Sequence, residues 1–368
     1  MLQKPIEIDE HSPLHSISKI NRNAALRAIG DLIQPSVPRA IFGEFLPTIS
    51  LVLITWILCA KWLYPFVLGT NGWAIPIYMA GCGLLAVWIL RLFLVQHDAE
   101  HQALSESRTL NFVIGHICSV FQFTPFLSWH RHHWHHHMTS GNLESQDGLG
   151  GIYTLTVSQF QALAGWQQKV YRISRSRWWF LILRPTGLFL FLQRFPLIRF
   201  LFSSIAQKPT RAELINILVL DVIYVAIGCL SINHWSMADP WVISYLIGAI
   251  AAATLGIILF YTQHQFQSTY YEHNEQWSFD DSALRGSMTL RMPFAIMEWA
   301  IGYINFHALH HLKANIPMYN LQQCHARLGI GIAMPECKPG DLWNTFDLAL
   351  RDETQHRMIG FAEFDASK

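Results

Sequence analysis

Histidine is the residue whose number and spacing stand out in this sequence. The chain has 19 histidines, nearly as many as its 25 acidic residues. Eleven of them fall into three clusters, His97–His101 (HDAEH), His130–His137 (HRHHWHHH) and His307–His311 (HALHH). Because residues i, i+3 and i+4 share one face of a helix, HxxxH directs two imidazoles to one point and HxxHH directs three. Imidazole binds iron, copper, zinc and nickel, so the clusters predict a metal site without choosing the metal.

The spacing leaves two alternatives open. The triplet His132, His135 and His136 fits HxxHH, and so does the triplet beginning at His133. A histidine-rich tract can also be a metal-binding run without a defined site. A lone histidine at a membrane surface is usually a plain interfacial residue, which is the interpretation for His11, His15, His116, His234, His325 and His356. Three clusters with helical spacing argue that the clustered histidines as a whole are neither an undefined metal-binding run nor plain interfacial residues.

Other familiar metal sites lack their sequence patterns here. Soluble di-iron bundles need paired ExxH motifs, and the only copy is Glu353–His356 in the polar tail. The absence of HExxH argues against a zinc protease. Six cysteines include no CxxC pair, so we expect neither a zinc–cysteine site nor a disulfide framework.

Long apolar segments must position the histidines. Hydrophobic residues make up 51% of the chain and charged residues 14%, against about 25% charged in ordinary soluble domains. Four segments approach or exceed the roughly 20 residues that cross a bilayer, namely Leu46–Leu68, Trp73–Val95, Leu214–Ile232 and Trp241–Tyr261. Short links after the first and third predict two helical hairpins. We expect the weaker runs 110–127 and 178–206 to lie in, or dip into, the membrane interface.

Basic residues predict the orientation. Five Lys and Arg precede residue 46, eleven fall in 96–213 and eight follow Tyr261, whereas the short links hold none. By the positive-inside rule, both termini and the middle segment are cytoplasmic. Two spans separate the second and third histidine clusters, so all three clusters lie on this same side. We therefore expect an all-α integral membrane fold with a cytoplasmic helical cap that holds the histidines.

The remaining composition defines the parts of the chain. With 26 basic and 25 acidic residues, there is no net basic field for nucleic acid. The polar first forty residues do not have the form of a signal peptide. We divide the chain into a cytoplasmic segment 1–45, a membrane domain with its cap 46–335, and a cytoplasmic tail 336–368 with a helix over 341–351.

Three ionisable residues fall within the apolar segments. Asp221 is a functional candidate by default, although we favour a neutral or paired group at a helix interface, with Asn216 as its partner. Lys61 and Arg91 are expected to extend to the outer and inner membrane interfaces. A metal or proton transporter would need ionisable ligands at mid-span, and only Asp221 fits that alternative.

The clusters and their flanks resemble the integral-membrane fatty acid desaturases, in particular bacterial acyl-lipid desaturases. The likeness runs from about residue 40 to 330. Beyond the three clusters it includes HHMTSGNL at 136–143, YTQHQF at 261–266, Gly302-Tyr303, and HL at 311–312 with IPMYNL at 316–321. These flanks make the resemblance more specific than the histidine clusters alone.

The resemblance implies a fold, an activity and a ligand set. It implies four transmembrane helices in two hairpins and an O2-dependent desaturation of a fatty acyl chain by two non-haem iron ions. Trp129 and the sequence after the second cluster favour the register that begins at His133, and the family adds a ninth histidine, matched by His264 better than by His273. The implied ligands are His97, His101, His133, His136, His137, His264, His307, His310 and His311. No catalytic residue beyond the metal site is implied.

Four further residues are candidates to support the ligands from outside the metal shell. They are Asp98, Glu100, His132 and His135. The first cluster in relatives reads His-Asp-Cys/Ala-Gly-His, so Glu100 is a departure from the family pattern. We expect it to accept a hydrogen bond from a ring N–H or to face water. Because of this departure, a different metal or a different reaction outcome from that of the relatives also stays open.

Other oxidations on the same scaffold stay open, namely hydroxylation, acetylenic-bond formation, carotenoid-type oxygenation, and decarboxylation to a terminal alkene. The 31 residues between His101 and His133 favour the desaturase side over sterol-type hydroxylases. The chain lacks nucleotide, haem and iron–sulfur motifs, so electrons must come from a separate ferredoxin- or cytochrome-like protein. Arg172, Arg175 and Arg177 form a basic strip that would meet this donor or, as we favour, lipid headgroups. The resemblance favours a bacterial inner membrane.

Overall fold

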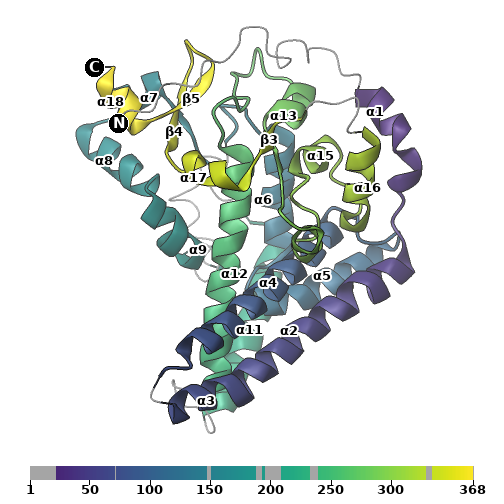
Figure 1. The fold of residues 1–368 in the computed structure, drawn as a ribbon. Helices are drawn as coiled ribbons and strands as arrows, with labels where there is room; N and C mark the ends of the chain where they lie inside the picture. The colour runs from purple at the N-terminus through teal and green to yellow at the C-terminus, as the bar shows by residue number, and fades with distance from the viewer. Residues whose placement is uncertain are drawn as a thin grey trace.

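The computed structural model describes residues 22–70, 72–146, 151–187, 193–194, 209–232, 239–328 and 334–367. These residues form a mostly helical fold. Figure 1 shows long helices in the lower half and a layer of short helices and strands above them. The histidines lie where the two layers meet.

Four helices are long and apolar enough to cross a membrane, which agrees with the sequence prediction. The first is one continuous helix, Arg39–Gly69, made of η3 (Arg39–Phe45), α2 (Leu46–Leu58), η4 (Cys59–Leu63) and α3 (Tyr64–Gly69). The others are α4 (Ile75–Glu100), α11 (Arg211–Ile232) and α12 (Pro240–His264). Two of them continue past the expected ends, α4 to Glu100 and α12 to His264, so their last turns enter the upper layer.

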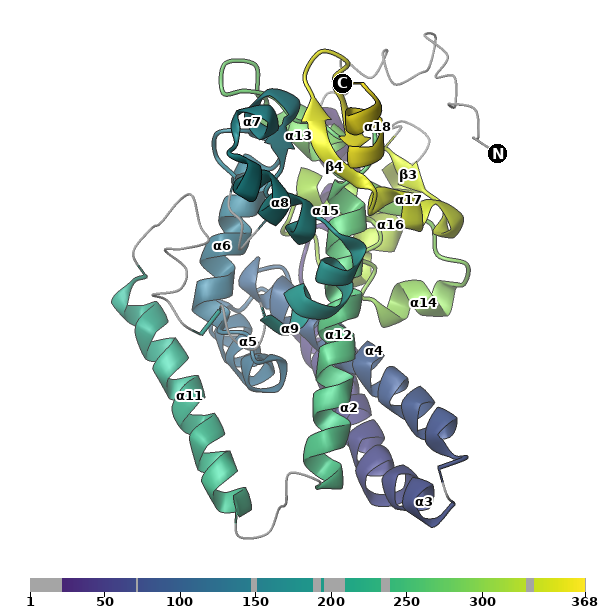
Figure 2. The ribbon, with the colours of Figure 1, turned by 90° about the vertical axis from the view of Figure 1, so that its left-hand side faces the viewer.

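Helix α4 is the central helix of the long layer. Half of its apolar window is buried, against 22% for each of the other three. It packs against α2, α12 and the helix α5 (Arg108–Gln122). Gly248 allows the close approach of α12, because a Cβ there would lie 2.9 Å from the Leu85 side chain. Helix α11 instead packs against α6 (Phe126–Thr139), and Figure 2 shows it standing apart from the other long helices.

The apolar run 110–127 is divided by a sharp bend rather than forming one interfacial helix. Helix α5 begins at Ser107, whose side chain accepts a hydrogen bond from the Leu110 N–H. It ends at Phe123, which has a left-handed φ of 55°. Helix α6 then begins at Phe126, at 100° to α5. This bend directs the second histidine cluster toward the end of α4.

The remaining helices are short. Of the run 178–206, only 178–187 and 193–194 are among the described residues, and they contain η5 and α9. The short helices are α1 (Arg22–Ala28), η2 (Gly30–Leu32), α7 (Val157–Ala162), α8 (Gly165–Ser174), η5 (Trp179–Leu183), α9 (Arg184–Thr186), α13 (Phe279–Arg285), α14 (Ala295–Ala300), α15 (His307–Leu312), α16 (Met318–Leu328), η7 (Pro339–Asp341), α17 (Leu342–Thr345) and α18 (Phe361–Ala366).

Two small sheets depart from the all-α expectation. In one, β4 (Leu348–Asp352) pairs in parallel with β1 (Leu155–Thr156) and antiparallel with β5 (Arg357–Gly360). In the other, β2 (Thr289–Leu290) pairs in parallel with β3 (Glu336–Cys337). The expected tail helix over 341–351 is therefore wrong beyond Thr345. Pairing with residues far away in the sequence, and burial of Leu350 against Phe160, override the local pattern.

The ionisable residues of the long helices are mostly paired. Asp221 accepts a hydrogen bond from Arg194 at 2.7 Å, as the paired interpretation predicted. Asn216 is not its partner, because its side-chain oxygen accepts from the Leu127 N–H at 3.2 Å. Lys61 lies over the Trp62 ring on an exposed part of the helix.

Arg91 is buried inside the protein rather than exposed at the end of a flexible side chain. It is 1% exposed and forms an ion pair of 2.5 Å with Glu44 of η3. The guanidinium group also donates to the Trp299 carbonyl and stacks over the Trp299 ring. The reason is packing, since a carboxylate from the first helix lies within reach inside the protein.

Candidate metal centre

Four helices bring nine histidines together. His97 lies in the last turn of α4, with His101 directly after it, and His264 is the last residue of α12. Helix α6 contributes His133, His136 and His137, and α15 contributes His307, His310 and His311. Each of the nine is at most 7% exposed. The two long helices therefore deliver their histidines at their polar ends, where α6 and α15 cover them.

The nine histidines form two groups, and within each group the ligand atoms lie within 4.8 Å of one another. The first group is His97, His101, His133, His137 and His310, and the second is His136, His264, His307 and His311. The second cluster on α6 is divided between the groups, because His136 points away from its neighbours at i−3 and i+1. The groups adjoin, with the His137 and His311 rings stacked at 4.2 Å.

The spacing of the ring nitrogens suits a metal ion. In the first group, the Nε2 atom of His133 lies 2.9 Å from that of His97 and 3.0 Å from that of His137. In the second, the Nε2 atom of His264 lies 3.1 Å from that of His136 and 2.9 Å from that of His307. Two nitrogens bound at about 2.1 Å and at right angles on one metal ion are about 3 Å apart. Each group thus has the donor spacing of a metal-binding site.

Burial keeps these imidazoles in the form that binds metals. Burial, reinforced by neighbouring histidines, lowers the pKa of His101, His137 and His311 well below the usual value. Neutral imidazole has a free lone pair for a metal ion. Among the described residues, neither ring nitrogen of His101 has a hydrogen-bond partner, nor has Nε2 of His311. Unpartnered buried nitrogens are costly, and a metal ion would satisfy them.

Groups outside the two clusters orient some of the rings. The Nδ1 atom of His264 lies 3.0 Å from the Gly286 carbonyl oxygen, which leaves Nε2 facing the second group. Such a contact fixes ring orientation in metal sites. Asp98 accepts a hydrogen bond of 2.6 Å from the Met318 N–H, and its carboxylate lies 3.9 Å from Nδ1 of His97. It thereby ties α4 to the start of α16 beside the site.

The other candidate supporting residues lie differently from what we expected. Glu100 is 1% exposed, and neither of its carboxylate oxygens has a hydrogen-bond partner among the described residues. It therefore neither accepts from a ring N–H there nor faces water. His132 and His135 belong to neither group, and the His135 ring contacts Thr139 on its own helix. His273 also lies outside, in an ion pair with Glu144 and Glu353.

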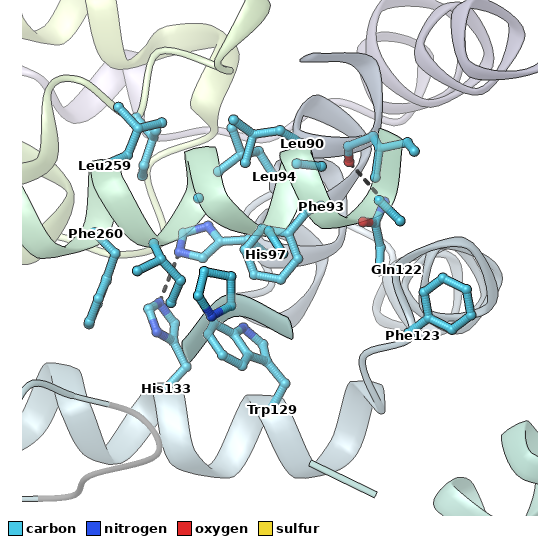
Figure 3. A pocket seen from close by; sticks show the side chains of 18 of the residues that line it. Leu90, Phe93, Leu94, His97, Gln122, Phe123, Trp129, His133, Leu259 and Phe260 are labelled. Carbon is cyan, nitrogen blue, oxygen red and sulfur yellow. Dashed lines mark hydrogen bonds between the residues drawn. The ribbon is translucent and has the colours of Figure 1, made fainter. Parts of the chain in front are cut away.

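An apolar cavity adjoins the histidines. About 1120 Å³ of space not filled by atoms lies within its lining, including space that is open to solvent. Figure 3 shows His97 and His133 beside Trp129 and Phe93, with Gln122 and Phe123 farther along the cavity. His307 also lines it. The cavity thus passes members of both histidine groups.

Sequence reasoning missed several lining residues. The Trp129 ring stacks on His133 at 5.3 Å, and Gln122 donates a hydrogen bond of 3.0 Å to the Ile89 carbonyl. Arg184 also lines the cavity. Trp129 was noted only as a register marker, four residues before His133. No local signal identified Gln122 and Arg184, because their position depends on the α5–α6 bend and on the packing of α9 against α12.

The sequence model of the family described as "Fatty acid desaturase" matches residues 71–332. That range contains all nine of the grouped histidines.

Individual relatives have similar descriptions. A "Fatty acid desaturase" of Bacillus subtilis is 31% identical over 248 residues, which are 66% of this chain and 65% of the relative. An "sn-1 oleoyl-lipid 12-desaturase" of Synechocystis is 26% identical over 64% of both chains. An "sn-1 acyl-lipid omega-3 desaturase (ferredoxin)" of Nostoc is 25% identical over 85% of this chain and 84% of the relative. The chain thus spans slightly less than two thirds of the first two relatives.

Proposed function

Because the chain belongs to the fatty acid desaturase family, we propose that it is a membrane enzyme that inserts a carbon–carbon double bond into a fatty acyl chain. The reaction would use O2 and a pair of non-haem iron ions. The observation that carries the proposal is the contact between two groups of buried histidines and one apolar cavity. A metal site beside an apolar cavity has the form needed to oxidise a hydrocarbon chain.

We propose that the first histidine group holds one iron ion and that the second holds the other. Bound iron would supply the activation of O2, because no side chain is a strong enough oxidant to remove hydrogen from an unactivated methylene. Neutral imidazoles suit this role since they bind the metal without adding charge. The nine histidines would act as ligands, and none of them is needed as an acid or a base.

The cavity would bind and position the acyl chain. Its walls exclude water through apolar side chains such as Phe93, Leu94 and Phe260. His97, His133 and His307 line the same space, so a methylene held there lies beside both groups. Regiochemistry is then a matter of placement, because neighbouring carbons are chemically alike and only their distance from the site differs.

The membrane arrangement is part of the proposal. We propose two helical hairpins in a bacterial inner membrane, with both termini and the histidines on the cytoplasmic side. The same proposal keeps the division into 1–45, 46–335 and 336–368. Strand β3 of the last part pairs with β2, and β4 with β1, so this tail would close over the cap.

We propose that electrons come from a ferredoxin- or cytochrome-like protein. The printed name of the Nostoc relative includes ferredoxin, which supports the first choice. The expected basic strip has little unpaired positive charge on its exposed side chains. Arg172 pairs with Asp365 and Arg177 with Asp347, each at 2.7 Å, and Arg175 is 5% exposed.

The test is to express the chain with a ferredoxin and its reductase in a bacterial host and to analyse total fatty acids by mass spectrometry. His136→Ala removes a member of the second group, and His132→Ala is the matched control on the same helix. We expect products short of two hydrogens from the wild type and from the control, and none from His136→Ala. A product with added oxygen, or a shortened chain with a terminal alkene, would replace desaturation by hydroxylation or decarboxylation. Unchanged fatty acids from an iron-loaded protein would contradict the proposal.

A further inference from the structure

Most of the largely buried arginines that the structure describes have a carboxylate partner. A buried charge costs free energy unless it is paired. The pairs among the described residues are Arg91–Glu44 at 2.5 Å, Arg194–Asp221 at 2.7 Å and Arg351–Glu272 at 3.8 Å. Arg175 and Arg184 differ, because no carboxylate of the described chain lies within 4.0 Å of either one. Both cations lie against the Phe180 ring, with guanidinium carbons 5.9 and 4.8 Å from its centre.

Arg175 is a fixed positive charge inside the cap. It is 5% exposed, and its Nη2 atom donates to the Gln265 side chain at 2.7 Å and to the Leu348 carbonyl at 3.1 Å. Its Nε and Nη1 atoms have no hydrogen-bond partner among the described residues. The Tyr261 ring packs over the guanidinium group at 5.5 Å. Within the described part of the chain, the charge is thus held by neutral groups, and no anion cancels it.

Arg184 carries a second charge to the wall of the apolar cavity. It is the first residue of α9, is partly buried, and lines the cavity together with His97 and His133. Its one hydrogen bond among the described residues runs from Nη2 to the Gly151 carbonyl at 3.2 Å. Burial first, and then the charge of Arg175, lowers the pKa of Arg184 to about 10. It therefore stays protonated at neutral pH, with donors left over.

We propose that Arg184, with Arg175 behind it, binds the anionic group at the polar end of the acyl substrate. The group is a phosphate or a carboxylate, because a guanidinium fork matches both. This inference rests on the proposed function, which places the acyl chain in the same cavity. Anchoring one end of the chain at Arg184 fixes how many methylenes separate it from the histidines, so Arg184 would be a specificity-determining residue.

The experiment measures binding to the purified, iron-loaded protein in a nonionic detergent by native mass spectrometry. Four probes distinguish the contribution of the charged group to binding from that of the acyl chain. They are oleate with its uncharged counterpart methyl oleate, and dioleoylphosphatidylglycerol with its uncharged counterpart dioleoylglycerol. The variant is Arg184→Gln, and Arg184→Lys is a second variant that keeps the charge. Arg177→Gln is the matched control, because it removes a nearby arginine that is already paired with Asp347. Gly256→Leu narrows the cavity, since Gly256 lines it and a Cβ there would lie 3.4 Å from Leu90.

We expect at least one anionic probe to bind the wild type about 10- to 100-fold more tightly than its uncharged counterpart. Arg184→Gln should remove this preference and leave the uncharged probes unchanged, whereas Arg184→Lys should retain part of it. A preference confined to oleate assigns the site to a carboxylate, and one confined to phosphatidylglycerol assigns it to a phosphate. Equal binding of charged and uncharged probes by the wild type would overturn the proposal, and this comparison needs no variant.

Two further outcomes separate this inference from the proposed function. If Gly256→Leu weakens the binding of the uncharged probes but charged and uncharged probes bind equally well, the cavity binds acyl chains and the proposed anion site is wrong. If no probe binds, or if Gly256→Leu leaves the binding of every probe unchanged, the cavity does not bind the acyl chain, and the proposed function is contradicted before the anion site is tested. A preference that survives in Arg184→Gln would place the anion elsewhere and would also overturn the inference.

Discussion

Burial keeps most of the clustered imidazoles neutral. It is the main reason why the pKa of His133, His307 and His310 lies well below the usual value. Neutral imidazole rings whose nitrogens have no hydrogen-bond partner can bind a metal ion. The local spacing of HxxHH could reveal His307 and His310, whereas it left two registers open in the second cluster, of which the family resemblance favoured the one that begins at His133. It could not reveal the partition of α6 between two groups, which depends on the positions of α4, α12 and α15.

His273 has the opposite character and gives a pH prediction. Hydrogen bonds to Glu144 and then to Glu353 raise its pKa above the usual value. A raised pKa stabilises the fold below the unfolded-state pKa of about 6.5, and this stability is lost as the pH rises through the folded-state pKa. Because the side chain is 44% exposed, we expect the midpoint of thermal unfolding to fall by only about 2 °C or less between pH 6 and pH 8.5.

The control for this prediction is His273→Gln, which cannot titrate. Its unfolding midpoint should lack this step between the same pH values. A wild-type midpoint that rises across this range, or an equal fall in the variant, would show that the Glu144–His273–Glu353 contact does not link pH to stability.

Single elements place the histidines through close contacts. The bend between α5 and α6 requires Phe126 to pack over Gly115, where a Cβ would lie 2.2 Å from the Phe126 ring. The ion pair of Glu44 with Arg91 joins η3 to α4, and Arg91 in turn holds the Trp299 carbonyl ahead of α15. Each contact links an apolar helix to a segment that carries histidines.

Gly115→Ala tests the bend. The added methyl group must displace the Phe126 ring, so we expect a loss of about 1–3 kcal/mol in unfolding free energy and a lower iron content, since α6 carries three of the clustered histidines. Gly83→Ala is the matched control, because a Cβ there meets nothing within 4 Å. Unfolding assays and metal analysis of both proteins provide the readouts. Equal stability of the two variants would refute the role given to this contact.

Glu44→Gln tests the buried ion pair. Leaving Arg91 buried without its counter-ion should cost about 3–5 kcal/mol. The double variant Glu44→Leu with Arg91→Met should recover most of this loss, since it replaces the pair by apolar side chains. Thermal unfolding in one detergent compares the three proteins. A single variant as stable as the wild type would mean that the charge pair is not needed for the packing of η3 on α4.

Hydropathy and periodicity predicted these elements only where the signal is local. The four apolar helices appear in the sequence as uninterrupted runs, and the described residues contain four such helices. The sharp turn at Phe123 was missed because Pro125 lies inside a run that remains apolar on both sides. The strand Leu348–Asp352 was read as part of a helix because its partners, Leu155–Thr156 and Arg357–Gly360, are recognised only in three dimensions.

The whole molecule combines two layers with different tasks. The long helices supply an apolar environment, and two of them, α4 and α12, end in histidines. The upper layer closes over those ends with α6, α15 and the small sheets (Figures 1 and 2). The cavity lies between α4, α12 and the α5–α6 bend, where the two layers meet. The apolar runs and the histidine clusters predicted the two layers, whereas the position of Arg184 at the cavity could be found only from the packed structure.

The central claim is that each histidine group holds one metal ion. The most direct test is the iron content of the purified, reconstituted wild type, of His310→Ala from the first group and of His307→Ala from the second, measured by mass spectrometry of the metal. The account predicts about two iron ions per chain in the wild type, one for each group, and about one in each variant. A wild type with one ion or none, or variants that both keep two, would contradict it.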